Sequence, residues 1–269
     1  MRNIAKTILN VGLSAPVKIL HITDIHITKA NDKDSERYHE LMERRTQTFI
    51  REGQNAPKNP SEHLIEAIEL AEKEGYLLVN TGDAIDLYTQ GCLEEYHKIA
   101  DGHDMMFTPG GHEHQKNYVR TMEEPDEYYK EVREKLKKDF KEYDLDLSSR
   151  VINGLNIICA DNSLDYYNKR TVELFKKELE KGLPIIVFSH DPIWDSILNK
   201  KAPMHPNIKL TEEDYKASHE MIDLLLNHPL VIATFSGHNH LDQTVLINGK
   251  THYSTSALYK SNCRYIEIK

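Results

Sequence analysis

Cysteine and long apolar runs are scarce in this chain, and their scarcity excludes several classes of protein. The three cysteines are far apart, odd in number and without a CxxC pair, so neither a disulfide framework nor a thiolate zinc site is expected. No segment approaches the roughly 18 consecutive apolar residues of a membrane-spanning helix, and residues 1–16 lack the apolar core of a signal peptide. From sequence we therefore expect a soluble cytoplasmic protein without a membrane span.

Basic residues are also too dispersed to follow a nucleic acid backbone. The chain has 34 Lys and Arg against 43 Asp and Glu, a net charge of -9, and contains no long basic block. An extended nucleic acid partner is therefore not expected. Because an acidic chain repels phosphate at long range, a phosphate ligand would need local positive charge, which bound divalent cations supply.

The hydrophobic residues, 39% of the chain, are enough to build a substantial core. A length of 269 residues fits one large domain or two small ones. We find no internal repeat, low-complexity segment or linker, and the candidate ligands described below span most of the sequence. A single domain over residues 1–269 is therefore predicted, with no prediction of its oligomeric state.

Five short apolar runs rich in Val and Ile each end on a residue that can bind a metal. Runs of this length predict buried strands. Open α/β sheets bind ligands at the carboxyl ends of their strands, so these residues are expected to converge on one site. The runs and the residues that close them are 17–23 with Asp24 and His26, 77–82 with Asp83, 105–111 with His112, 185–189 with His190, and 230–237 with His238 and His240.

The segments between these runs predict helices and hairpins. Helical spacing of apolar residues marks 38–50, 61–71, 125–143, 168–181 and 211–227, with Ser61 as the expected cap of the second helix. Asn-Gly pairs at Asn153-Gly154 and Asn248-Gly249 predict two hairpins. Strand–helix–strand units give parallel pairing and hairpins give antiparallel pairing, so the sheets are expected to be mixed.

Mixed carboxylate and imidazole ligands suit Mn, Fe, Zn, Co or Ni. Two neighbouring ions can share one bridging carboxylate and clamp the attacking and leaving oxygens of an in-line phosphoryl displacement. Each motif taken alone also fits a turn or a helix cap, but their joint order favours a metal centre. The sequence therefore predicts two divalent metal ions as cofactors. Mn is the ion that we would add to the protein in vitro.

The order of these motifs resembles that of the calcineurin-like metallophosphoesterase superfamily. The family pattern runs DxH, GDxxD, GNH followed by Asp or Glu, a single His after a strand, and GHxH, and this chain is similar to it from Asp24 to His240. The resemblance implies an α/β fold, a four-layer α/β/β/α sandwich of two mixed sheets. It also implies a dinuclear metal site at the carboxyl ends of the strands.

The resemblance further implies a role for each motif residue. His112 resembles the catalytic histidine that protonates the leaving oxygen, and Asp86 resembles the acidic partner that orients its imidazole. Glu113 matches an acidic position with a supporting rather than a ligating role. The implied metal ligands are Asp24, His26 and His240 at one ion, Asp83 between both ions, and His190 and His238 at the second ion.

One departure from the family pattern concerns the second ion. Gly111 stands where the family has an Asn, whose side-chain oxygen binds that metal. A water or substrate oxygen could fill the gap, a neighbour such as His114 or Asn80 could replace it, or the second site could be weak. Since one neutral oxygen donor is lost and the other ligands are kept, the sequence predicts a second metal that is more easily lost.

These features predict a metal-dependent phosphoesterase. A metal-bridging hydroxide would attack the phosphorus of a small-molecule phosphodiester or phosphomonoester, with His112 as general acid. Leu87 and Tyr88 follow Asp86 where the protein phosphatases of the superfamily have Arg-Gly, which argues against a Ser/Thr protein phosphatase. Substrate choice is expected to lie in loops such as 29–37, 89–104 and 193–210.

The alternative is a non-catalytic metal-binding or protein-binding module that retains the phosphoesterase fold, with Gly111 as the first sign of decay. Retention of His112 and Asp86, whose implied roles are catalytic rather than ligating, favours the enzyme.

Overall fold

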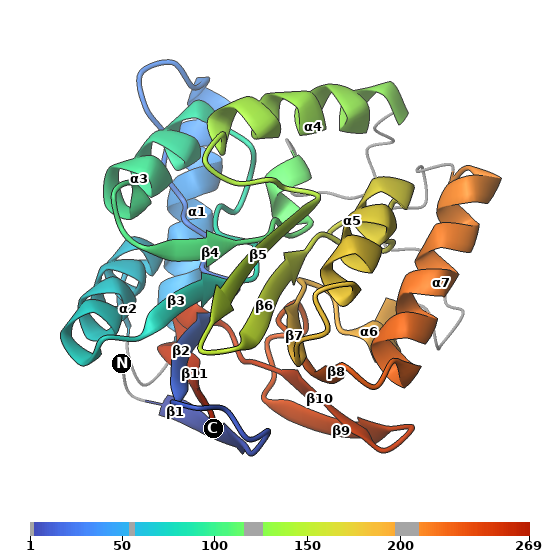
Figure 1. Cartoon of the computed structure of the whole chain (residues 1–269). Helices are drawn as coiled ribbons and strands as arrows, with labels where there is room; N and C mark the ends of the chain where they lie inside the picture. The colour runs from blue at the N-terminus through green and yellow to red at the C-terminus, as the bar shows by residue number, and fades with distance from the viewer. Residues whose placement is uncertain (1–2, 54–56, 116–125, 197–209) are drawn as a thin grey trace.

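The computed structural model describes residues 3–53, 57–115, 126–196 and 210–269 and contains two facing β-sheets (Figure 1). The first sheet has the strand order β1-β11-β2-β3-β4 and the second β5-β6-β7-β8-β10-β9. The strands of the first sheet are β1 (Asn3–Leu9), β11 (Asn262–Ile268), β2 (Val17–Ile22), β3 (Leu77–Asn80) and β4 (Met105–Phe107). Those of the second are β5 (Leu147–Ile152), β6 (Leu155–Ala160), β7 (Ile185–Phe188), β8 (Val231–Ser236), β10 (Lys250–Ser254) and β9 (Gln243–Ile247).

Both sheets are mixed, as predicted. The strands β2, β3 and β4 pair in parallel, as do β6, β7 and β8, whereas β5–β6 and β9–β10 are antiparallel hairpins. At each hairpin turn the Asn-Gly pair has positive φ at both residues, 50° and 83° at Asn153-Gly154 and 51° and 78° at Asn248-Gly249. This conformation matches the twist of the flanking strands and confirms both predicted hairpins.

Helices cover the outer face of each sheet (Figure 1). The first sheet carries α1 (Glu36–Glu52), α2 (Pro60–Glu74), α3 (Gln90–Ala100) and α4 (Asp126–Asp139). The second carries α5 (Lys169–Leu179) and α7 (Glu212–Asn227), with the short α6 (Ile193–Ser196) beside them. In the described ranges, none of the helices combines the length and apolar composition needed to cross a bilayer.

The cap predicted for α2 and the loop predicted at 89–104 were wrong. The side-chain oxygen of Asn59, not that of Ser61, caps α2, because it accepts from the Ser61 amide at 3.0 Å and Pro60 fits the first helical position. Most of the expected loop 89–104 is helix α3, which Thr89 caps by accepting from the Cys92 amide. The expected loop 193–210 begins with α6, and residues 197–209 lie outside the described residues.

Three apolar layers hold this arrangement together. Buried side chains of both sheets, such as Val79, Ile186 and Phe235, meet between the sheets. Alternate residues of the same strands point outward, so that Leu78 packs under the helices of the first sheet and Val187 under those of the second. The predicted four-layer α/β/β/α sandwich is confirmed, and it brings the carboxyl ends of β2, β3, β4, β7 and β8 to one edge.

Candidate metal centre

The loops after these strands turn sharply at the edge of the sandwich. Five of the predicted ligands have the left-handed backbone conformation, which is uncommon for residues that carry a Cβ. Such outliers cluster at functional sites, where the surrounding structure holds them at a cost of about 1–3 kcal/mol each. Their φ values are 52° at Asp24, 55° at His26, 48° at Asp83, 70° at His238 and 56° at His240.

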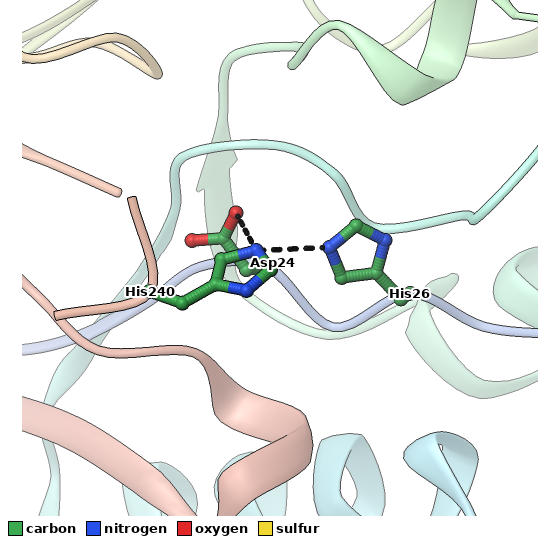
Figure 2. A group of neighbouring side chains, drawn as sticks. All are labelled: Asp24, His26 and His240. Atoms are coloured by element: carbon green, nitrogen blue, oxygen red, sulfur yellow. Dashed lines mark hydrogen bonds and ion pairs between the residues drawn. The ribbon is translucent and has the colours of Figure 1, made fainter. Parts of the chain in front are cut away.

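A first group of donor atoms is formed by Asp24, His26 and His240 (Figure 2). His240 Nε2 lies 3.2 Å from Asp24 Oδ1 and 3.3 Å from His26 Nε2, and all three donor atoms are within 4.8 Å of one another. Asp24 is fully buried, and within the described part of the chain its Oδ1 has the close contact with His240 but no hydrogen bond of good geometry. A buried carboxylate oxygen facing two imidazole nitrogens is the donor set of a divalent cation.

A second group is formed by Asp83, His190 and His238. Asp83 Oδ2 lies 3.3 Å from His190 Nε2, which in turn lies 3.2 Å from His238 Nδ1. The same Asp83 oxygen is 3.8 Å from His26 Nε2 in the first group. Asp83 therefore stands between the two groups, in the position of a carboxylate that two metal ions could share.

The atoms of these ligands that face away from the groups are fixed by hydrogen bonds. Asp83 Oδ1 accepts from the His112 amide at 2.9 Å, which leaves Oδ2 to face the histidines. His190 Nδ1 donates to the Thr81 carbonyl at 2.7 Å, and His240 Nδ1 lies 3.1 Å from the Tyr259 hydroxyl. Such contacts fix the orientation and tautomer of metal-binding histidines, so that the opposite nitrogen presents a lone pair.

Charges within the groups favour the ionised carboxylates that metals require. Burial alone would raise the pKa of Asp24 and of Asp83, but nearby histidines, His240 and His190 respectively, hold each pKa below its usual value. Burial opposes charge on His190 as well, yet Asp83 raises its pKa well above the usual range. Metal binding at His190 Nε2 would therefore release a proton. The residues fit two divalent ions.

His112 lies beside both groups, on the short 3-10 helix His112–His114 after β4. Its Nδ1 is 2.7 Å from the main-chain carbonyl of Asp86 and 3.5 Å from the Asp86 carboxylate. We predicted that the Asp86 side chain orients this imidazole, but the close contact is made by the backbone oxygen. The His112 side chain is 15% exposed, whereas His26 is buried, so His112 can meet a ligand from solvent.

The Asp86 carboxylate instead joins His26 to an arginine that sequence analysis missed. Arg45 on α1 makes a bidentate ion pair with it, through Nε and Nη2 at 2.7 Å each, and His26 Nδ1 lies 3.1 Å away. Burial would raise the pKa of Asp86, but hydrogen bonds from Arg45 and His26 hold it below its usual value. His26, Asp86 and His112 also lie close enough to hold an ion, but Arg45 already occupies both Asp86 oxygens. Met42, Arg45 and Phe49 form the buried stripe of α1. Their helical spacing in the sequence was a signal that Arg45 faces the interior.

Replacing Arg45 by Met is expected to destabilise the protein by about 3–5 kcal/mol, because the buried Asp86 carboxylate loses its cationic partner. Urea denaturation of the metal-free protein would measure the change in the free energy of unfolding. Arg44→Met is the matched control, since Arg44 is exposed on the same helix turn and its loss should cost at most about 0.5 kcal/mol. Equal stability of the two variants would contradict the role given to Arg45.

Glu113 supports the loops that carry Asp83 and His112. Its buried carboxylate accepts four amide hydrogens and so ties the two loops together. Gly110 makes this approach possible, because a Cβ there would lie 2.3 Å from Asp83 Oδ1. The donors are the amides of Asp83 at 2.9 Å, Ala84 at 2.6 Å, Ile85 at 3.1 Å and Gly110 at 2.6 Å.

The two neighbours considered as substitutes for the missing asparagine make other contacts. Asn80 Oδ1 accepts from the Gly82 amide at 3.0 Å, and His114 Nδ1 lies 3.2 Å from the Gly110 carbonyl. Neither belongs to the group of Asp83, His190 and His238. A residue that we did not consider, Asp191, contacts the group: its Oδ1 is 3.2 Å from His238 Nδ1.

Comparison with known proteins identifies a family. Residues 17–242 match the family model described as calcineurin-like phosphoesterase. No curated protein sequence matches the chain.

Among solved structures the chain is similar to a dimetal phosphatase from Danio rerio, with a TM-score of 0.54 and 13% identity over 91% of this chain and 88% of that one. A putative 5′-nucleotidase from Staphylococcus aureus matches at a TM-score of 0.45 and 11% identity, over 91% of this chain and 49% of that one. Phosphopantetheinyl hydrolase from Mycobacterium tuberculosis matches at 0.42 and 10%, over 95% and 91%. At these identities the likeness concerns the fold alone.

Proposed function

The chain belongs to the calcineurin-like phosphoesterase family, and from this membership we propose that it is a hydrolase that cleaves phosphate esters with two divalent metal ions. The observation that carries the proposal is the position of Asp83 Oδ2, 3.3 Å from His190 Nε2 in one donor group and 3.8 Å from His26 Nε2 in the other. His112 lies at the same edge, its amide bonded to Asp83. Two metal positions and a solvent-accessible imidazole side by side support phosphoester hydrolysis.

The residues of the two groups would hold the ions. Asp24, His26 and His240 would hold one ion, His190 and His238 the other, and Asp83 both. When bound, divalent ions at such a site activate water and stabilise negative charge on phosphate oxygens. The family's substrates are phosphate esters, and we propose a small-molecule phosphodiester or phosphomonoester for this chain.

His112 is proposed to protonate the leaving oxygen. Its Nδ1 contacts the Asp86 carbonyl, so the opposite ring nitrogen, Nε2, is the one that can give a proton to the substrate. Arg45 and His26 hold Asp86 from the other side, which fixes the carbonyl that orients the imidazole. The chain's own contribution is thus an oriented proton donor beside two ligand groups.

Metal-stripped protein is expected to hydrolyse neither a nitrophenyl phosphomonoester nor a nitrophenyl phosphodiester, and addition of Mn²⁺ is expected to restore turnover of at least one of them. The physical reason is that bound divalent ions supply local positive charge for a phosphate that this acidic chain repels at long range. Steady-state rates at increasing free Mn²⁺ would test this and show which ester is preferred. Failure to bind Mn²⁺ would contradict the proposal.

The second candidate, a non-catalytic module that keeps the fold and a metal, is favoured by one observation, the glycine at position 111. A non-catalytic module would bind Mn²⁺ without turnover of either ester, whereas an enzyme would bind Mn²⁺ and turn over at least one of them. The position of His112 beside the ligand groups supports the enzyme.

A further inference from the structure

We propose that Asp191 supplies to the second metal the oxygen ligand that Gly111 cannot supply. The inference rests on the proposed function, because it concerns the same pair of ions. It assigns a metal-binding role to a carboxylate that follows His190 directly in the sequence.

The second donor group is one ligand short. Asp83, His190 and His238 provide three donor atoms, and Gly111 has no side chain to provide a fourth. Closed sites for zinc and similar ions take four ligands, and harder ions take more. An oxygen donor near His238 or His190 would complete the set.

Asp191 extends the row of donor atoms at the spacing of neighbouring ligands. Ligand atoms bound to one ion at about 2.1 Å and at tetrahedral or right angles lie about 3.0–3.4 Å apart. The row runs from Asp83 Oδ2 to His190 Nε2 at 3.3 Å, to His238 Nδ1 at 3.2 Å and to Asp191 Oδ1 at 3.2 Å. Asp191 stands at the end of this row, outside the set of three atoms that all lie within 4.8 Å of one another, so it would reach a shared ion by a turn of its side chain.

The main chain of Asp191 is fixed by two hydrogen bonds. Asn162 binds it in both directions, because Asn162 Nδ2 donates to the Asp191 carbonyl at 2.9 Å and Asn162 Oδ1 accepts from the Asp191 amide at 3.0 Å. Both residues are buried. The side chain is therefore kept at the metal edge.

One oxygen of the Asp191 carboxylate lacks a hydrogen bond within the described residues. The residue is only 3% exposed, and Oδ2 has no hydrogen-bond partner among the residues that the structure describes. A buried carboxylate is costly unless it is paired or binds a cation. The other oxygen of Asp191, Oδ1, lies 3.2 Å from Nδ1 of the His238 imidazole.

A purely orienting role for Asp191 conflicts with the geometry at His238. Nδ1 is the His238 atom that faces His190 Nε2, and it is therefore the nitrogen available to a shared ion. A nitrogen that binds a metal carries no proton and cannot donate to Asp191. Metal binding would thus remove the contact between Asp191 and His238 and leave the carboxylate free to bind the same ion.

The test is the binding of Mn²⁺ itself, measured by equilibrium dialysis with metal analysis and by the electron paramagnetic resonance of coupled Mn²⁺ pairs. Wild type is expected to bind two ions per chain. In Asp191→Ala the first ion should bind unchanged, while the second should bind at least about tenfold more weakly, with loss of the coupled signal. Asp191→Asn, which keeps one oxygen donor, should fall between them. From the sequence we predicted that the unmodified chain loses its second metal easily; with Asp191 as a ligand, this easy loss is expected of Asp191→Ala instead.

A rescue variant tests whether Asp191 binds the metal or only supports the fold around it. Gly111 has φ -66° and ψ -33°, which any L-residue can adopt, so Gly111→Asn can be introduced without backbone strain. In the Asp191→Ala background it should restore the affinity for the second ion. Asp146→Ala is the matched control, because Asp146 is a buried carboxylate that pairs with Arg133 and Arg170 and should leave Mn²⁺ binding unchanged.

The outcomes distinguish this inference from the proposed function. Two tightly bound ions in both wild type and Asp191→Ala would overturn the role of Asp191 and leave the phosphoesterase proposal intact. Weak binding in Asp191→Ala that Gly111→Asn does not restore would also overturn it, as would equal weakening by Asp146→Ala. No Mn²⁺ bound by wild type would overturn both proposals.

Discussion

Asp83→Ala is expected to abolish metal-dependent turnover, with a fall in kcat/KM of at least about 10³-fold, because both ions lose their shared ligand and the ions contribute several kcal/mol to the transition state. The variant also frees the His112 amide that now donates to Asp83 Oδ1. Steady-state kinetics at saturating Mn²⁺ and metal content after dialysis would measure both effects. Retention of two ions and of turnover would contradict the bridging position of Asp83.

The control for this variant is Asp101→Ala. Asp101 belongs to a further cluster of possible ligands, with His97 and Glu142, but this cluster is largely exposed. Exposed acidic residues bind divalent ions weakly, so Asp101→Ala should change neither turnover nor the number of tightly bound ions. A loss of bound metal in this control would place an ion at the exposed cluster.

His112→Ala is expected to lower kcat by about 10²–10⁴-fold while the bound metal is unchanged, because the variant removes the proposed general acid and none of the ligands. The effect should depend on the leaving group. Nitrophenolate leaves readily without a proton, whereas an alkoxide does not, so the loss should be smaller for a nitrophenyl ester than for an alkyl ester. Comparison of kcat for the two esters in wild type and variant measures this.

A different result would assign His112 another role. An equal loss on both esters, accompanied by a lower metal content, would identify His112 as a ligand rather than a proton donor. Its distance from the Asp86 carboxylate, 3.5 Å compared with 2.7 Å to the Asp86 carbonyl, also bears on the mechanism. Asp86→Asn should retain the carbonyl contact to His112 and weaken the hold on His26.

Much of the fold and the convergence of the candidate ligands at one edge could be predicted from the sequence, because the signals are local. Strand ends such as 22–24 and 188–190 are marked by a change from apolar residues to a metal-binding side chain within a few positions. The hairpin turns are equally local, since Asn153-Gly154 adopts positive φ with little dependence on the rest of the chain. Parallel pairing then brings the strand ends to one edge, and the resemblance to a known family supplied the roles.

Contacts between distant segments were decided only by the tertiary structure. The pairing of Arg45 with Asp86 depends on how α1 packs against the loop after β3, and no spacing in the sequence encodes that distance. The same packing turns the Asp86 carboxylate toward His26 and leaves its carbonyl for His112. The groups that hold a functional side chain in place come from whichever element packs against it. Motif spacing therefore cannot specify these contacts.

The local sequence thus determined which residues are candidates for the chemistry, and tertiary packing determined how each is held. Asp and His at strand ends are visible in the chain because the strand period and the residue types are local properties. The left-handed conformation of Asp83 and the position of Asp191 beside His238 are not visible there. Both arise at the edge where the loops after several strands meet. The physical reason is that burial, sterics and charge there are set by residues far apart in the sequence, as with the contact of Asp24 to His240.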